Sequence, residues 1–211
     1  SKKSSRDAAE GLIIIGENQN NFTLTEINTE TDFVAKNNEF IEFCSKISEV
    51  SLSVKSIDDL QNQKLNESTV QESIVNLISK IGENIKLRRF ENINKDGKKI
   101  SYYIHNKSSD LAGKIVAAVK YNSSKVESKS FANNVCMHIA AMSPMSLDEK
   151  SLDKNFLESE KKIIEEQLSK EGKKPEIIEK IMTGKLNKVI SENTLLGQKW
   201  VVDQDITVKK A

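Results

Sequence analysis

The spacing of the apolar residues changes from alternation to a helical period at Val34, and this change constrains the fold most strongly. Before it, Gly11–Ile15 is a short apolar run and Phe22–Thr25 alternates apolar and polar residues, with turn-forming residues between them. This pattern predicts a β-hairpin. After Val34, apolar residues that should face a core recur at helical spacing. They are Phe40, Phe43, Cys44, Ile47 and Val50.

The order of elements continues through the first half and is repeated in the second. A second helix is predicted around Val70–Ile78, and Gly82 ends it in the manner of a C-terminal glycine. Asn84–Asn92 predicts a strand, and Lys99–His105 with Lys114–Tyr121 predicts another strand pair. A helix follows, whose predicted apolar face consists of Phe131, Val135, His138, Ile139 and Met142.

We interpret the two halves as related α+β units, each with helices on one face of a small antiparallel sheet. The predicted domains are an N-terminal core unit over residues 1–95 and the first part of a C-terminal core unit over residues 96–145. Residues 146–194 are expected to form an inserted helical hairpin of the coiled-coil type. Residues 195–211 are expected to return to the C-terminal unit.

The predicted hairpin consists of two helices, about Leu152–Ser169 and Glu176–Ile190, joined by Lys170–Pro175. Pro175 fits the first turn of the second helix. The apolar stripes of the two helices are narrow and flanked by charge, so we expect them to leave spare apolar surface. This surface either packs on its own domain or associates with a second copy of the chain. The residues predicted for self-association, as a homodimer, are Ile181, Leu186 and Ile190.

Composition argues against several classes of function. The chain has 211 residues, with 32 Lys and Arg against 31 Asp and Glu, and its formal net charge is +1. This balance argues against a protein whose main affinity is for phosphate backbones. No apolar run approaches the roughly 20 residues of a membrane span. Because the start of the sequence is polar and shows no secretory signal, we expect a cytoplasmic protein.

Few side chains offer chemistry. Cys44 and Cys136 lie in helical apolar patterns without a second ligand at metal-binding spacing, and we interpret them as buried thiols in a reducing compartment. His138 is interpreted as a core histidine. His105 is expected to be exposed at a strand end, with no motif that supplies a catalytic partner. Phosphate-binding glycine motifs and metal-loop spacings are not found. The sequence therefore predicts no enzyme, no cofactor and no metal site.

The segment Thr31–Asn37 places Asp32 and Phe33 side by side at a corner between strand and helix. Two interpretations follow from this pattern. In the first, Thr31 or Asp32 caps the helix and Phe33 folds back on its first turns as a hydrophobic staple. In the second, Phe33 is exposed and enters another molecule, because corners of this kind present side chains to partners.

The segment Glu30–Asn37, with the sequence ETDFVAKN, resembles the hallmark of bacterial elongation factor Ts, the nucleotide exchange factor of elongation factor Tu. Other segments are similar to motifs of this family and occur in the family's order. They are Lys2–Gly11, Ile81–Arg89, Met137–Ala141, Gly172–Ile177 and Leu196–Val201. The resemblance covers essentially the whole chain.

The resemblance implies a guanine nucleotide exchange factor in translation elongation. Such a factor binds elongation factor Tu and promotes GDP release by disturbing its magnesium and phosphate site. The family's core also has two related α+β units and a coiled-coil hairpin. The residues assigned to the partner are the pair that enters near the magnesium site, Asp32 and Phe33, together with Thr31, Val34, Ile81, Gly82 and His105.

The sequence departs from the family pattern at both ends. It starts after the N-terminal helical domain, which docks on the partner's nucleotide-binding domain. It stops at Thr207–Ala211, where the family continues through a helix and a last strand. We therefore expect the sheet of the C-terminal unit to be incomplete in this sequence. Whether residues 1–211 promote nucleotide exchange requires a direct test.

Two other classes of function are compatible with the residues. One is a structural or chaperone-like adaptor that works through the hairpin, with Phe33 in its core. The other is an RNA-binding module, whose basic residues would be Lys86, Arg88, Arg89 and Lys120. Burial of Phe33 would favour the adaptor, and steeply salt-dependent binding would mark the RNA-binding module. The near-zero net charge argues against direct nucleic-acid binding.

Overall fold

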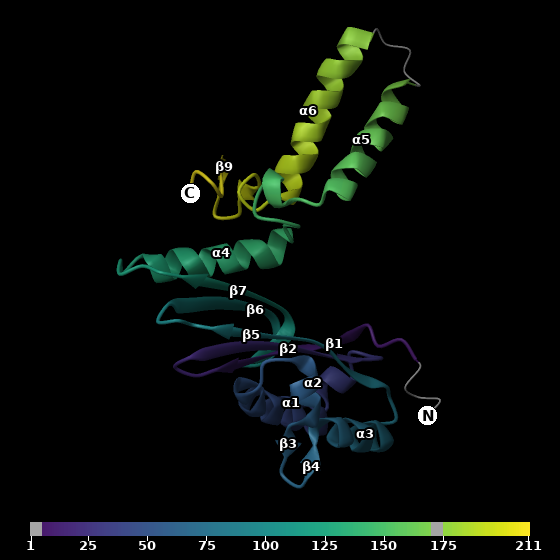
Figure 1. The fold of residues 1–211 in the computed structure, drawn as a ribbon, viewed down its shortest axis with the longest axis vertical. Coiled ribbons are helices and arrows are strands. Elements are labelled where there is room, and N and C mark those ends of the chain that lie inside the picture. Colours follow the sequence, from purple (N-terminus) through teal and green to yellow (C-terminus); the bar gives the residue numbers. More distant parts are fainter. Residues whose placement is uncertain (1–5, 170–174) are drawn as a thin grey trace. The chain divides into compact units, whose positions relative to one another are not determined.

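The computed structural model describes residues 6–169 and 175–211. It contains helices and antiparallel strands, which confirms the predicted α+β class (Figure 1). By its internal contacts the chain divides into two compact units, Ser1–Cys136 and Met137–Ala211, called unit 1 and unit 2 below. The domain boundaries expected near residues 95, 145 and 194 stay predictions.

Unit 1 is built on a five-stranded sheet in the order β5-β2-β1-β7-β6. The strands are β1 (Glu10–Glu17), β2 (Asn21–Thr29), β5 (Ile85–Asn94), β6 (Lys99–Ser109) and β7 (Ala112–Tyr121). The predicted hairpin is confirmed as β1–β2, and the predicted second strand pair is confirmed as β6–β7. β1 pairs with β7 only through Ile13 and Ile14, so the two groups of strands share a short seam.

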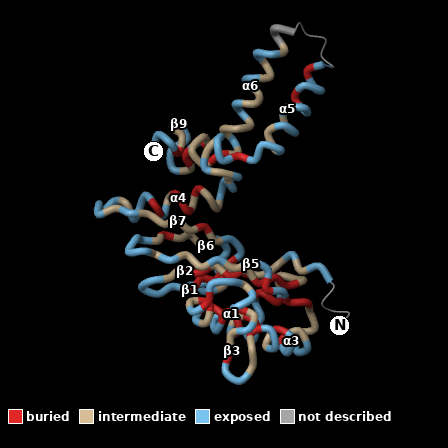
Figure 2. Tube along the Cα trace, in the orientation of Figure 1, coloured by how far each residue is buried: buried red, intermediate tan, exposed pale blue. Residues whose placement is uncertain are grey.

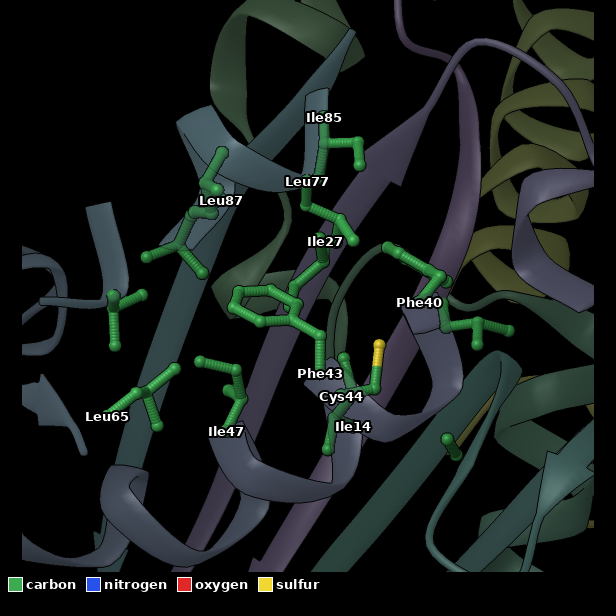
Figure 3. Packing of buried hydrophobic residues seen from close by; sticks show 14 of the residues in the cluster. Ile14, Ile27, Phe40, Phe43, Cys44, Ile47, Leu65, Leu77, Ile85 and Leu87 are labelled. Carbon is green, nitrogen blue, oxygen red and sulfur yellow. The ribbon is translucent and has the colours of Figure 1, made fainter. Parts of the chain in front are cut away.

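Helices cover one face of β1, β2 and β5 (Figure 1). They are α1 (Asn38–Val50), α2 (Ile57–Asn62) and α3 (Val70–Ile81), with the 3-10 turns η1 (Val34–Lys36) and η2 (Ser51–Ser53) and the strand pair β3 (Lys64–Leu65) and β4 (Ser68–Thr69). Their apolar side chains meet those of the strands in the main core, where Ile27, Phe40 and Ile47 are fully buried (Figure 3). Buried positions are concentrated in this layer (Figure 2).

The main helix, α1, begins at Asn38 instead of at Val34. The side chain of Asn37 accepts hydrogen bonds from the backbone N–H groups of Glu39 (2.9 Å) and Phe40 (3.3 Å), which makes it the N-cap. Val34 lies before the helix, in the 3-10 turn η1. Because its side chain is buried there, it matches the apolar spacing of the helix without belonging to it.

The end of α3 fixes the turn that leads into β5. A capping box at Thr69 and Glu72 starts the helix, and Gly82 ends it with φ of 87°. The left-handed conformation favours glycine because other residues carry a Cβ. The predicted glycine end is therefore confirmed, and residues 82–84 follow as a tight connection to β5.

The opposite face of β1 and β2 packs on β6 and β7. Phe22 and Tyr102 meet there with ring centroids 5.6 Å apart. The next helix, α4 (Ser128–Met142), places Cys136 within unit 1, where its thiol donates to the carbonyl of Ser101 at 3.2 Å. Cys136 is fully buried.

The predicted apolar face of α4 is partly wrong. Phe131 and Met142 are each 43% exposed, whereas Ala132, Val135 and Cys136 are buried. The buried face is therefore rotated away from Phe131 toward positions 132, 135 and 136.

Unit 2 contains the end of α4 and the helical hairpin. Its elements are η3 (Glu149–Ser151), α5 (Lys154–Ser169), α6 (Pro175–Asn193), β8 (Lys199–Trp200) and β9 (Asp203–Thr207). α5 and α6 lie side by side, as the predicted hairpin requires, and Ile164 and Leu168 are buried on α5 (Figure 1). α6 begins at Pro175, in agreement with the sequence, while the predicted bend at 170–174 lies outside the described residues.

His138 is a satisfied core histidine, as predicted. Its ring is fully buried and stacks on Trp200 with centroids 5.3 Å apart. The N–H of Val201 donates to Nδ1 (3.2 Å), so Nε2 carries the proton and donates to Oε1 of Gln198 (3.0 Å). The amide of Gln198 in turn donates to the carbonyls of Met142 and Glu192.

Candidate functional site

The loop between β2 and α1, residues 30–37, exposes a phenylalanine on a firmly held backbone. Phe33 is 78% exposed, whereas Val34 and Ala35 are only 5% and 4% exposed. The η1 turn is closed by hydrogen bonds from Lys36 N–H to Phe33 O (3.1 Å) and from Asn37 N–H to Val34 O (2.9 Å). The exposure of Phe33 excludes the staple interpretation, and it also argues against an adaptor that has Phe33 in its core.

The polar residues beside Phe33 do not cap α1, so the interpretation with a cap at Thr31 or Asp32 is excluded. Asn37 occupies that position, because the 3-10 turn displaces the helix start. The carboxylate of Asp32 lies 3.4 Å from Nζ of Lys36. Both side chains are substantially exposed, and exposed pairs of this kind contribute about 0–1 kcal/mol. A partner could therefore displace Lys36 from Asp32 at little cost.

The turn after α3, residues 82–84, is held directly against this first loop. Oε2 of Glu83 accepts from the N–H of Thr31 (3.0 Å), and Oε1 accepts from its hydroxyl (2.7 Å). Glu30 of the first loop binds the turn in return, because its Oε1 accepts from the N–H of Asn84 (2.6 Å). Residues 52 positions apart in the sequence thus meet, so the turn that contains the predicted site residue Gly82 and follows Ile81 is bonded to the loop that carries Asp32 and Phe33.

His105, the last predicted contact, lies on β6 and is exposed. It stands opposite Ile115 of β7, and its Nδ1 is 3.3 Å from the hydroxyl of Tyr103. The same strand reaches the first loop through Ser108, whose hydroxyl donates to the carbonyl of Ala35 (3.2 Å). β6 therefore connects to the loop, while the side chain of His105 contacts its own strand.

Sequence reasoning missed three residues of this site. Glu30 and Glu83 lie in the motifs that carry the family resemblance, but a single acidic residue does not reveal a partner 50 or more positions away. Ser108 lies near the end of β6, and no pattern in the sequence around it points to a role. For the two glutamates, the available signal was their place inside the motifs ETDFVAKN and IGENI.

The hairpin residues proposed for self-association are half-buried. Ile181, Leu186 and Ile190 lie along α6, and each keeps part of its surface accessible. Ile163 on α5 is exposed. The hairpin therefore retains apolar surface, as its narrow stripes predicted.

The basic residues of the RNA-binding interpretation are largely paired within unit 1. Arg88 and Arg89 both bind the carboxylate of Glu26, and Lys120 binds Asp96 at 2.7 Å. Burial alone would raise the pKa of Glu26, but hydrogen bonds from Arg89 and Asn28 and the charges of both arginines hold it below its ordinary value. These cations are already paired with carboxylates of the same unit, and this pairing argues against a surface that binds phosphate groups.

The two cysteines are free thiols, and both are buried. Burial raises the pKa of Cys44 far above its ordinary value and that of Cys136 to about 11. Both therefore remain protonated at neutral pH. In the part of the chain that the structure describes, no cluster of three or more His, Cys, Asp or Glu could hold a metal ion. Over the same residues, none of the helices has the length and apolarity to cross a membrane.

Fold and site together define the class, an α+β protein that displays an exposed aromatic side chain on a loop held by a second loop. A family model described as Elongation factor TS matches residues 30–211. The chain belongs to the elongation factor Ts family, and its role is that of a translation elongation factor. The resemblance seen in its motifs is thereby confirmed.

Curated relatives named Elongation factor Ts match along nearly the full chain. The protein of Roseobacter denitrificans is 38% identical over 210 residues, which cover 100% of this chain and 70% of that protein. The Legionella pneumophila (strain Philadelphia 1) protein is 40% identical over 212 residues, covering 98% and 69%. The Clostridium botulinum protein is 37% identical over 214 residues, covering 99% and 70%.

Proposed function

We propose that the chain is a guanine nucleotide exchange factor that binds elongation factor Tu and promotes the release of GDP. The observation that carries this proposal is the exposed ring of Phe33 beside Asp32, on a loop whose next two residues are buried. Buried aromatic anchors supply much of the energy of protein interfaces. Membership of the elongation factor Ts family supports the identity of the partner. Such a function operates in the bacterial cytoplasm or in an organelle of bacterial descent.

The proposed mechanism needs no bond-making chemistry in this chain. A factor that binds the nucleotide-free partner more tightly than the loaded partner weakens nucleotide binding by the same factor. Insertion of Phe33 displaces the elements that hold the partner's magnesium ion, and Asp32 stabilises the displaced arrangement by hydrogen bonds or charge. Because about 1.4 kcal/mol corresponds to a tenfold change in affinity, a few contacts suffice.

The other proposed contacts surround this pair. Thr31 shapes the loop, and buried Val34 supports it from beneath. Ile81 and Gly82 approach the partner beside Phe33, because Glu83 ties their turn to Thr31. His105 adds a contact from β6. We also propose a homodimer through Ile181, Leu186 and Ile190 of the hairpin.

The test is the release of labelled GDP from elongation factor Tu. We expect Phe33→Ala to reduce the stimulated release rate at least about tenfold, since loss of an interface hot spot weakens binding by about 2 kcal/mol or more. Phe131→Ala is the matched control, because this second exposed phenylalanine lies on α4, outside the proposed site. Equal stimulation by the Phe33→Ala variant and the unmodified chain would remove Phe33 from the mechanism.

A further inference from the structure

Two glutamates bind the two loops of the site to each other in a reciprocal way. The carboxylate of Glu83, from the second loop, accepts both the backbone N–H and the hydroxyl of Thr31 in the first loop. The carboxylate of Glu30, from the first loop, accepts the backbone N–H of Asn84 in the second. Each loop therefore supplies one acid that satisfies a backbone donor of the other loop.

We infer that Glu30 and Glu83 are positioning residues, which form a clasp that holds Phe33 ready for insertion. This inference rests on the proposed exchange function. Neither glutamate needs to touch the partner, because each acts through the loop that carries Phe33. The clasp also makes the turn at Gly82 and the loop at Phe33 a single contact surface.

The geometry of the clasp favours a strong interaction. Hydrogen bonds to ionised carboxylates are shorter and stronger than those between neutral groups. The side chain of Glu30 is only 18% exposed and is also paired with Arg6 at 3.6 Å, and Asn84 is buried. Asn84 is itself held by a hydrogen bond from its Nδ2 to the carbonyl of Arg6 (2.6 Å). The clasp is thus built into the partly buried base of the loop.

Thr31 lies two residues before Phe33, so fixing it restricts where the ring can point. The carbonyl of Thr31 accepts the hydroxyl hydrogen bond of Thr29 (2.9 Å), and Glu83 holds the N–H and the side chain of Thr31. On the other side of Phe33, Val34 and Ala35 are anchored in the core. A loop fixed at both ends has less conformational entropy to lose on binding, and preorganisation of this kind increases affinity.

The variant that tests the clasp is Glu83→Gln. It keeps the size of the side chain but replaces the charged carboxylate with a neutral amide that has one acceptor oxygen. The hydrogen bonds to Thr31 therefore lose their charge assistance, and the hydroxyl of Thr31 must accept from the amide instead of donating. We expect stimulated GDP release to fall about tenfold, a change that corresponds to about 1.4 kcal/mol, because the charge-assisted hydrogen bonds to Thr31 are weakened. Glu67→Gln, at the exposed turn between β3 and β4, is the matched control and should leave release unchanged.

A second pair of variants keeps the test independent of the folding of Glu83→Gln. Thr31→Val removes the hydroxyl that binds Glu83 while it keeps the shape of the side chain, and Thr31→Ser restores the hydroxyl. We expect slower release with valine and recovery with serine. Equal rates for the two variants would overturn the inference.

Hydrogen exchange of backbone amides reports on the clasp without the partner. In Glu83→Gln the amide of Thr31 should exchange about tenfold faster, while amides of the core strands keep their protection. In a Phe33→Ala background, Glu83→Gln should reduce GDP release no further, because the clasp acts through the ring. If Phe33→Ala slows release and Glu83→Gln does not, the clasp is refuted and the proposed function stands. If neither variant slows release, Phe33 is removed from the mechanism. If the unmodified chain itself does not stimulate release, the proposed function fails.

Discussion

Phe33 keeps its ring in water because the residues on both sides of it are held elsewhere. Thr31 is fixed by Glu83, and Val34 turns into the core between the strands and α1. These contacts restrict the backbone on both sides of Phe33 and keep the ring from folding back onto the core. The apolar area that stays exposed is available to a partner, and burial contributes about 25 cal/mol for each Å² removed from water.

The two neighbours should differ sharply in their effect on stability. We expect Val34→Ala to lower the free energy of unfolding by about 1–3 kcal/mol, because it removes buried methyl groups from the core. Phe33→Ala should change it by no more than about 0.5 kcal/mol, since its ring is exposed. Urea unfolding measures both values. A large loss of stability in Phe33→Ala would mean that the ring packs within its own unit.

Glu26 makes the stability of unit 1 sensitive to acid. Its pKa is held below the ordinary value of 4.5, so its contribution is complete above that value and is lost as the pH falls through the lower folded-state pKa. Lowering the pH should therefore reduce the free energy of unfolding more for the unmodified chain than for the Glu26→Gln variant, because the glutamine side chain does not titrate. Identical pH profiles below 4.5 would show that the contacts with Arg88 and Arg89 contribute nothing measurable.

Single residues also mark the limit of what could be predicted. The motif at Glu30–Asn37 indicated where a partner would bind, but its pattern left Phe33 divided between a staple and an exposed contact. Which of the two occurs depends on how the loop is held, and Thr31 is held by Glu83, 52 positions further along the sequence. The spacing of apolar residues predicts which face of a helix or strand is buried. It does not predict which loops, distant in the sequence, contact each other.

Helices and strands were more predictable, because their apolar periods are local. The pairs β1–β2 and β6–β7, the glycine end of α3 and the α5–α6 hairpin all follow from such patterns. The start of α1 was wrong because a buried 3-10 turn continues the apolar spacing before the true cap. The predicted face of α4 was partly wrong because the smaller residues Ala132 and Cys136 are buried there, while Phe131 and Met142 are exposed.

The hairpin gives a prediction about assembly. A charge placed on its apolar stripe should oppose self-association, so Ile190→Asp should shift sedimentation toward the monomer. Val202→Asp is the control, because Val202 is an exposed apolar residue in the β8–β9 turn of the same unit. An unaltered sedimentation profile for Ile190→Asp, or an equal shift for both variants, would count against a dimer through the hairpin.

Considered as a whole, the chain contains two units that each have an interior of their own. Unit 1 has a layered apolar core on both sides of its sheet, and unit 2 holds buried His138 and Gln198 in a hydrogen-bonded network. The proposed contacts with elongation factor Tu lie on unit 1, and the proposed self-association lies on unit 2. The two proposals can therefore be tested by separate substitutions.

The central claim is that this chain prefers the nucleotide-free form of elongation factor Tu. The most direct measurement is its dissociation constant for the partner with and without saturating GDP and magnesium. We predict binding at least about tenfold tighter to the nucleotide-free form, and Phe33→Ala should reduce this difference. Equal affinity for the two forms would contradict the account, because a factor without that preference cannot displace the nucleotide.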